Sequence, residues 1–152
     1  MILSAPGPYA KKSGGNTAKP HRSPIVVRRR PGTKTQGILS FGPLRMPCAI
    51  GRSGTTSAKR EGDGATPVGA MRLICGYFRP ERARPFPSPL PFLPARSDLG
   101  WCDDPGNANY NRPVRLPCKG SRETMIRGDR LYDICIVLDW NLRSRQRGRG
   151  SA

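Results

Sequence analysis

The stretch LYDICIVLDWN, residues 131–141, decides the fold class of this chain. Its centre is a continuous apolar run bounded by polar residues, which is typical of a buried β-strand. A basic, glycine-bearing turn, RSRQRGRG at 143–150, follows it, and the sequence then stops at Ala152. A strand of this kind normally pairs with whatever follows its turn. We therefore expect an incomplete C-terminus and an apolar strand edge that favours aggregation.

Composition places the rest of the chain in the same class. The 152 residues suffice for one domain with a modest core, and hydrophobic residues make up 36% of them and aromatic residues 7%. With 18 glycines and 17 prolines, long helices are disfavoured and short strands joined by turns are favoured. We predict an all-β fold of mixed strands with little helix. Further strands are expected in a β-meander at 24–28, 37–41 and 44–51, with turns at Pro31-Gly32 and Gly42-Pro43, and in a long strand at 66–78.

The remaining segments are predicted to be loops. Residues 79–98 contain six prolines, which exclude a helix and any central strand. They favour a semi-rigid surface loop, with a PxxP-type recognition ligand as the alternative. Residues 101–104 and 109–113 are also expected to be loops, and residues 121–126 a single helical turn with Ser121 as its cap.

Positive charge dominates the chain, whose formal net charge is +17. Such a chain attracts polyanions such as nucleic acid, anionic lipid or acidic wall polymers. Residues 1–34 carry eight Lys and Arg and no acid, whereas all ten acids lie from Glu61 onward. Part of the excess therefore belongs to residues 1–23, which we predict to be a disordered basic tail. One functional reading is a basic all-β module that binds RNA or anionic wall polymer through residues 22–34 and 143–149.

The cysteines do not form a metal or disulfide pattern. The cysteines form no CxxC pair, which excludes a zinc ribbon. Their number is odd and most lie in apolar surroundings, which favours free buried thiols over a disulfide framework. Cys135 lies between two isoleucines and is expected in the core, whereas Cys102, beside two aspartates, looks the most exposed. A thiol nucleophile needs a base, and the only histidine is His21, in the predicted tail. The five cysteines are Cys48, Cys75, Cys102, Cys118 and Cys135.

Neither a metal nor a cofactor is expected. Asp98, Asp103 and Asp104 could hold a hard cation, but the sequence lacks the alternating oxygen ligands of an EF-hand loop. A pair of adjacent loop acids, as at Asp103 and Asp104, is more often used in a turn and in a local salt bridge, here to Arg96 or Arg112. The sequence therefore favours a structural role for these three carboxylates.

A glycine-rich run, REGDGATPVG at 60–69, resembles a phosphate-binding loop only superficially. It lacks the Lys-Ser/Thr pair of a P-loop, and it precedes a predicted strand rather than a helix. We expect a tight loop in which Gly62, Gly64 and Gly69 adopt backbone conformations that other residues disfavour.

Taken in order, five segments resemble the catalytic domain of the YkuD-type L,D-transpeptidases, and most closely a compact, proteobacterial-looking branch of that family. The similarity covers roughly residues 25–152, and the ordered set is more specific than any single motif. The segments are REGDGATPVG at 60–69, WCDD at 101–104, NYNRP at 109–113, LYD at 131–133 with VLDWN at 137–141, and GRGSA at 148–152.

The resemblance implies a β-sandwich-like domain over residues 24–152, incomplete at its C-terminus. It implies a cysteine thiolate that attacks a peptidoglycan stem peptide at a meso-diaminopimelate–D-alanine bond. D-Alanine leaves, and an amine of a second stem peptide resolves the thioester as a cross-link. A nearby histidine activates the thiolate, and backbone N–H groups stabilise the oxyanion. By the same resemblance, Thr66, Pro67, Tyr110 and Asn111 help to shape the substrate groove.

The sequence departs from the family at its catalytic signature, a histidine followed by a Ser/Thr-x-Gly-Cys segment. In this branch the signature begins a few residues after GRGSA, so neither residue is present before Ala152. None of the five cysteines takes the nucleophile's position. We therefore expect a family member from a truncated, frameshifted or degenerate gene, and a chain that is poorly folded or inactive.

The family resemblance and the N-terminal sequence predict different cellular locations. The family implies the cell envelope or periplasm. The N-terminal residues, however, hold no apolar run long enough for a signal-peptide core, and no window approaches transmembrane length. We expect no transmembrane segment, and a cytoplasmic location, a misassigned start and an unrecognised export route all stay open.

Overall fold

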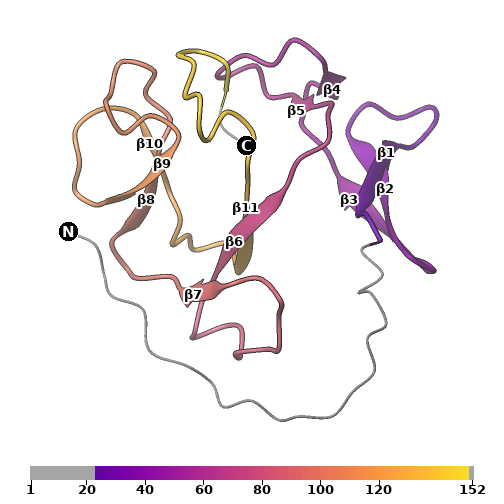
Figure 1. The fold of residues 1–152 in the computed structure, drawn as a ribbon, viewed down its shortest axis with the longest axis horizontal. Coiled ribbons are helices and arrows are strands. Elements are labelled where there is room, and N and C mark those ends of the chain that lie inside the picture. Colours follow the sequence, from indigo (N-terminus) through magenta and orange to yellow (C-terminus); the bar gives the residue numbers. More distant parts are fainter. Residues whose placement is uncertain (1–22, 151–152) are drawn as a thin grey trace, which may run out of the picture.

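The structure is all-β. A computed structural model describes residues 23–150, and within that range it contains eleven β-strands and no helix (Figure 1). This confirms the predicted fold class. The predicted tail, 1–23, lies outside the described residues except for Ser23. The strands are β1 (Val26–Arg29), β2 (Gln36–Phe41), β3 (Leu44–Ala49), β4 (Thr55–Thr56), β5 (Thr66–Pro67), β6 (Leu73–Phe78), β7 (Phe92–Pro94), β8 (Leu99–Cys102), β9 (Arg112–Arg115), β10 (Arg122–Thr124) and β11 (Ile134–Leu138).

The first sheet is the β-meander that the sequence predicts. Its order is β1-β2-β3, and both pairs are antiparallel. Gly42 and Pro43 form the two-residue turn between β2 and β3, and Gly42 has a φ of 55°, in the left-handed region that glycine tolerates best. Val27 pairs with Leu39, and Leu39 with Met46, so these three apolar side chains lie on one face of the sheet.

The central sheet has the order β11-β6-β7. β6 pairs antiparallel with β11 and parallel with β7, which lies in the proline-rich segment but at the sheet edge, where proline is tolerated. β11 is the other edge strand, and Ile134 and Ile136 are 49% and 39% exposed. The expected apolar edge is therefore confirmed. The prediction of a buried strand over 131–141 is wrong. The strand is shorter, and its residues 134 and 136 are exposed because β11 pairs only with β6 among the described strands.

The third sheet, with the order β10-β8-β9, corrects two predictions. Trp101 and Cys102, expected in a loop, are the last residues of β8, and Arg112 and Pro113, also expected in a loop, begin β9 opposite them. The helical turn expected at 121–126 is instead strand β10, which pairs antiparallel with β8. In each case pairing with a strand that is distant in the sequence overrides the local preference.

The long strand expected at 66–78 is wrong in extent, because it is two strands. β5 pairs in parallel with β4 in a small two-stranded sheet, and β6 begins only at Leu73. Between them the Arg72 N–H donates to Asp139 Oδ1 at 2.9 Å, and the Asp139 N–H donates to the Arg72 carbonyl at 3.0 Å. The chain therefore leaves one sheet and joins another within this stretch.

The apolar core is small. Large apolar side chains remain exposed, among them Val68 at 59% and Leu131 at 57%. Burial of apolar surface therefore contributes less here than in a well-packed domain, and hydrogen bonds between segments take a larger share. Among the described residues the buried apolar side chains are Phe78, Cys102, Tyr110, Met125 and Val137.

Replacing Gly76 in β6 tests the packing of the central sheet. A methyl group there would overlap the ring of Phe92, which Phe86 holds edge-on at 4.8 Å between ring centroids. We expect Gly76→Ala to lower the free energy of unfolding by about 1–3 kcal/mol, measured by urea denaturation. The matched control is Gly128→Ala, because nothing lies within 4 Å of an added methyl at that position. Equal effects of the two substitutions would contradict this packing.

Candidate functional site

Asn111 is the centre of a hydrogen-bonded cluster that joins the five motif segments. Its side chain is 1% exposed. Trp101 Nε1 donates to Asn111 Oδ1 at 3.1 Å, and Asn111 Nδ2 donates to the carbonyl of Trp140 at 3.0 Å. One amide thus connects the end of β8 to the segment that follows β11. We call this set of interactions the motif cluster.

A tight turn presents the Asn111 amide to both tryptophans. The Asn107 N–H donates to the Asp104 carbonyl and the Tyr110 N–H to the Asn107 carbonyl, both at 3.0 Å. Asn111 then adopts a φ of 56°, a left-handed conformation that asparagine tolerates better than most residues. Its own N–H donates to the Cys102 carbonyl at 2.8 Å, which fixes the turn against β8.

Tyr110 connects the same turn to the glycine-rich run. Its side chain is 2% exposed, and its hydroxyl donates to Glu61 Oε2 at 2.7 Å. Burial raises the pKa of Tyr110, and the hydrogen bond to the Glu61 carboxylate raises it further. The Glu61 N–H in turn donates to the Gly148 carbonyl at 2.9 Å. The run at 60–69, the turn at 109–113 and the C-terminal turn therefore meet around one carboxylate.

Asn141 organises the C-terminal basic turn. It has a φ of 48°, its Nδ2 donates to the carbonyls of Gln146 and Gly150, and its Oδ1 accepts from the Gln146 N–H at 2.8 Å. Trp140 Nε1 donates to the Arg149 carbonyl at 3.3 Å. The basic turn is therefore folded back onto the motif cluster, while Arg149 itself stays exposed.

The glycine-rich run is held by a buried ion pair. Lys59, which is 7% exposed, donates to Asp63 Oδ1 at 2.6 Å. This hydrogen bond, together with those from the backbone N–H groups of Arg60 and Ala65, lowers the pKa of Asp63 to about 2. Gly62 and Gly64 have positive φ angles of 72° and 65°, as expected from the sequence.

Gly69 departs from that expectation, because its φ lies outside the left-handed region. The ion pair between Lys59 and Asp63 was not predicted. The sequence does contain a signal for this ion pair: Lys59 and Asp63 are four residues apart and enclose the three residues 60–62, the last of which is a glycine. Residues 59–65 therefore form a structural corner, whereas Thr66 and Pro67 at the end of the run belong to β5.

An apolar cleft of about 710 Å³ lies between the first sheet and the central sheet. Val27 and Leu39 contribute to one wall, Ile136 and Leu138 to the other, and the β5 segment 66–67 lies along it. In Figure 1 the first sheet stands apart from β6 and β11, with β4 and β5 near the ends of both. We call this space the cleft.

The cleft separates the four predicted substrate-groove residues into two pairs. Thr66 and Pro67 line it and are half-buried, and Thr66 Oγ1 accepts a hydrogen bond from the Gly51 N–H at 2.8 Å. Tyr110 and Asn111 do not line it and are buried within the motif cluster. A ligand in the cleft can therefore contact the first pair, whereas the second pair supports the surrounding fold.

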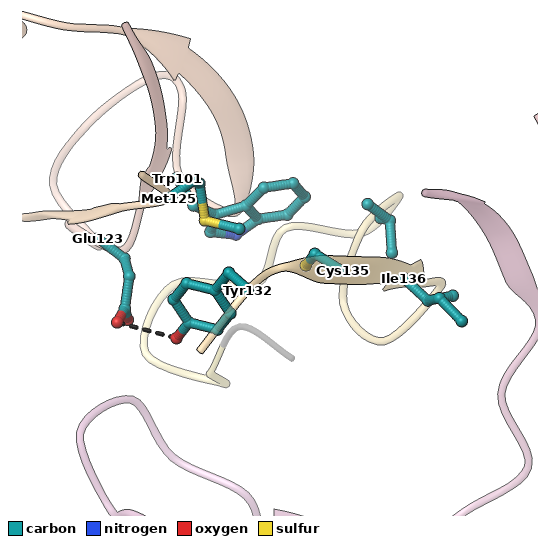
Figure 2. Close-up of a pocket in the computed structure, with 7 residues that line it drawn as sticks. Trp101, Glu123, Met125, Tyr132, Cys135 and Ile136 are labelled. Atoms are coloured by element: carbon teal, nitrogen blue, oxygen red, sulfur yellow. Dashed lines mark hydrogen bonds between the residues drawn. The ribbon is translucent and has the colours of Figure 1, made fainter. Parts of the chain in front are cut away.

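A smaller cavity of about 180 Å³ lies between β11 and the third sheet (Figure 2). Trp101 and Met125 lie on one side of it, and the Tyr132 hydroxyl donates to Glu123 Oε1 at 2.9 Å. Cys135 faces this cavity and is half-buried, so the expectation that it lies in the core holds only in part. Burial raises the pKa of its thiol, which disfavours the thiolate.

The thiols in the described residues lack the features of a nucleophile. All five are free, and Cys102, expected to be the most exposed, is 1% exposed because β9 and β10 flank its strand. Burial also raises the pKa of Cys75. Residues 23–150 contain no histidine, so none of these thiols has an imidazole base within that range.

The acidic residues near the third sheet behave as structural groups. Asp98 pairs with Arg96 at 3.1 Å and with Arg115 at 3.9 Å, whereas within residues 23–150 neither Asp103 nor Asp104 forms the expected salt bridge to Arg96 or Arg112. Asp104 Oδ1 accepts from the Gly106 N–H at 2.8 Å. Over residues 23–150 no group of three potential metal-ligating side chains comes together.

Comparison with known proteins gives no relative. No protein-family model matches the chain, and neither a curated protein nor a solved structure matches it significantly. The described part of the chain contains no helix that is long and apolar enough to cross a membrane. The functional argument therefore depends on the residues and their geometry.

Asn111→Ala tests the centre of the motif cluster. It removes two side-chain hydrogen bonds, leaves Trp101 Nε1 and the Trp140 carbonyl without this partner, and places alanine at a positive φ. We expect a loss of about 2–4 kcal/mol in the free energy of unfolding, measured by urea denaturation followed by tryptophan fluorescence. Asn109→Ala, at an exposed position two residues away, is the control and should have little effect. If Asn111→Ala lowers the free energy of unfolding no more than Asn109→Ala does, the structural role of the motif cluster is contradicted.

Asp63 should make the free energy of unfolding fall at acidic pH. Because its folded-state pKa is about 2 against an ordinary value of 3.8, its contribution is present above pH 3.8 and is lost as the pH falls toward 2. Urea denaturation across this range should show a shallower pH dependence for Asp63→Asn than for the wild type. Lys59→Met should flatten the same pH dependence, because Lys59 is the main cause of the lowered pKa. An unchanged slope in Asp63→Asn would contradict the assignment.

Proposed function

We propose that this chain is a member of the L,D-transpeptidase family that binds peptidoglycan stem peptide and does not itself carry out acyl transfer. One observation carries the proposal. The five segments that resemble the family fall in three parts of the sequence, 60–69, 101–113 and 131–152, yet they contact one another in a single cluster. A chance set of short matches has no reason to converge in space, whereas a shared scaffold does.

The stem peptide is assigned to the β5 side of the cleft. Thr66 and Pro67 lie on its wall, and both belong to the residues that the family resemblance associates with the substrate groove. Arg29 also lines the cleft, is exposed and has no carboxylate within 4 Å among the described residues, so it can pair with a stem-peptide carboxylate. Such binding places the protein in the cell envelope or periplasm.

The absence of acyl transfer follows from the chemistry of the thiols. The family reaction needs a thiolate that attacks the meso-diaminopimelate carbonyl and expels D-alanine, with a base to accept the thiol proton. Cys75 and Cys135 have raised pKa values, and residues 23–150 offer no imidazole. We therefore propose that the described residues bind and orient a stem peptide without forming the thioester.

Binding to a polyanion is the second candidate, and one observation favours it. Residues 23–60 contain no carboxylate, and Arg28, Arg29 and Arg30 are consecutive and exposed on the edge of the first sheet. RNA or an anionic wall polymer would be held there by charge, so its affinity would fall steeply as salt is raised. Stem-peptide binding in an apolar cleft would depend less on salt.

Sedimentation with purified peptidoglycan sacculi tests the first proposal. We expect the full chain to co-sediment and to release no D-alanine from tetrapeptide stems, as analysed by chromatography. Val68→Asp, which adds a charge at a 59% exposed position in the cleft, should reduce binding about tenfold.

Leu93→Asp is the matched control, because Leu93 is 54% exposed and lies on β7 outside the cleft. If both variants bind sacculi as the wild type does, the cleft is not the site. Release of D-alanine would contradict the absence of acyl transfer. If single-stranded RNA is bound more tightly than sacculi at low salt and lost at high salt, the polyanion candidate replaces the first.

A further inference from the structure

Two strands whose side chains line the cleft have an edge without a strand partner within residues 23–150. β1 is an edge strand of the first sheet and β11 an edge strand of the central sheet, and both contribute side chains to the cleft. An edge strand presents N–H and C=O groups without a partner, which can pair with an added strand. An added strand can therefore combine main-chain hydrogen bonds to such an edge with contacts between its side chains and the apolar walls of the cleft.

The walls of the cleft are apolar and incompletely covered. Ile25, Val27 and Val68 are 45%, 48% and 59% exposed, and Ile136 on the facing wall is 39% exposed. Exposed apolar side chains that line one hollow are typical of an interaction site. In an added strand every second side chain points to the same face, so a segment with apolar residues at alternate positions fits these walls.

Charge selects among the possible occupants. The first sheet and the loops beside it carry only basic side chains, and Arg29 reaches the cleft itself. A second copy of this chain would bring another net charge of +17 against this surface and would be repelled. A segment with acidic residues at its ends would instead be attracted to it.

We propose that the cleft binds an extended polypeptide segment of another protein, with alternating apolar residues in its middle and acidic residues at its ends. The segment adds to the free edge of β11 as a β-strand. Its apolar side chains fill the space between the central sheet and the first sheet, and its acidic ends pair with Arg29 and the neighbouring arginines. The proposal does not depend on the family assignment, because a free strand edge, apolar walls and basic charge are sufficient for it.

Fluorescence anisotropy with the full chain and synthetic peptides tests the proposal. The probe is a labelled peptide of about ten residues, with alternating valine and threonine and with glutamates at both ends. We expect saturable binding. An analogue with a central proline, which cannot complete the strand, and an analogue with lysines in place of the glutamates should each bind at least about tenfold more weakly.

One matched pair of variants and two further substitutions locate the site. Ile136→Asp should weaken binding about tenfold, whereas Ile74→Asp should not, because Ile74 is equally exposed, at 38%, but lies outside the cleft. Val27→Asp, on the opposite wall, should act like Ile136→Asp, and urea denaturation verifies that each variant is folded. Arg29→Glu should weaken the glutamate-ended peptide and strengthen the lysine-ended one.

Several results would overturn the proposal. They are equal binding of the proline analogue, no binding of any peptide, or equal effects of Ile136→Asp and Ile74→Asp. Self-association of the unliganded chain in sedimentation equilibrium, abolished by Ile136→Asp, would show instead that a second copy occupies the cleft. Because the assay uses no peptidoglycan, its outcome is independent of the sacculus experiment.

Discussion

The rest of the structure depends on the side chain of Asn111. It is a buried amide that accepts from one tryptophan side chain and donates to the backbone of another tryptophan, and so it connects the third sheet to the end of β11. An amide has one oxygen acceptor and one NH₂ donor, and here both are used within the interior. A shorter or aliphatic side chain supplies neither bond, and aspartate supplies no donor. This position therefore constrains residue type more strongly than any apolar position in the small core.

Polar contacts between segments are important for stability because the sheets bury little apolar surface against one another. Glu61 bonds to Tyr110 and to the Gly148 carbonyl, and Asn141 bonds to backbone groups of the C-terminal turn. Asp63 accepts from two nearby backbone N–H groups and from Lys59, which is buried with its charge paired. Such a network is stabilising only when its members are satisfied, since a buried group that loses its partner costs more than the bond was worth. Most of these bonds are local or join loops, so the cluster fixes the corners of the fold while the sheets remain separate.

The sequence predicted the elements that depend on local signals. The β-meander follows from its two turns, and the all-β class follows from the frequency of glycine and proline. The exposed strand edge at 134–138 follows from the apolar run within residues 131–141. The strands at 99–102 and 122–124 were missed because they are short, polar in part and defined by pairing across about twenty residues. The same limit applies to the site. Tyr110 and Asn111 were recognised as unusual, but a motif alone does not distinguish a residue that contacts substrate from one that supports the turn beneath it.

That distinction decides what the family resemblance can mean. Among the segments that carry the resemblance, Cys102, Tyr110, Asn111 and Val137 are buried, and hydrogen bonds join the segments to one another. They therefore specify a scaffold, and a scaffold does not imply an activity. Activity in this family requires a thiolate and a base; here burial raises the pKa of the Cys135 thiol, and residues 23–150 contain no histidine. The cleft, in contrast, is built from side chains that the scaffold leaves exposed. Within residues 23–150 it combines two strand edges without a strand partner, an apolar lining and an arginine, Arg29, without an ion pair. Recognition of an extended, acidic peptide is what those three features have in common, and it requires no chemistry from the cysteines.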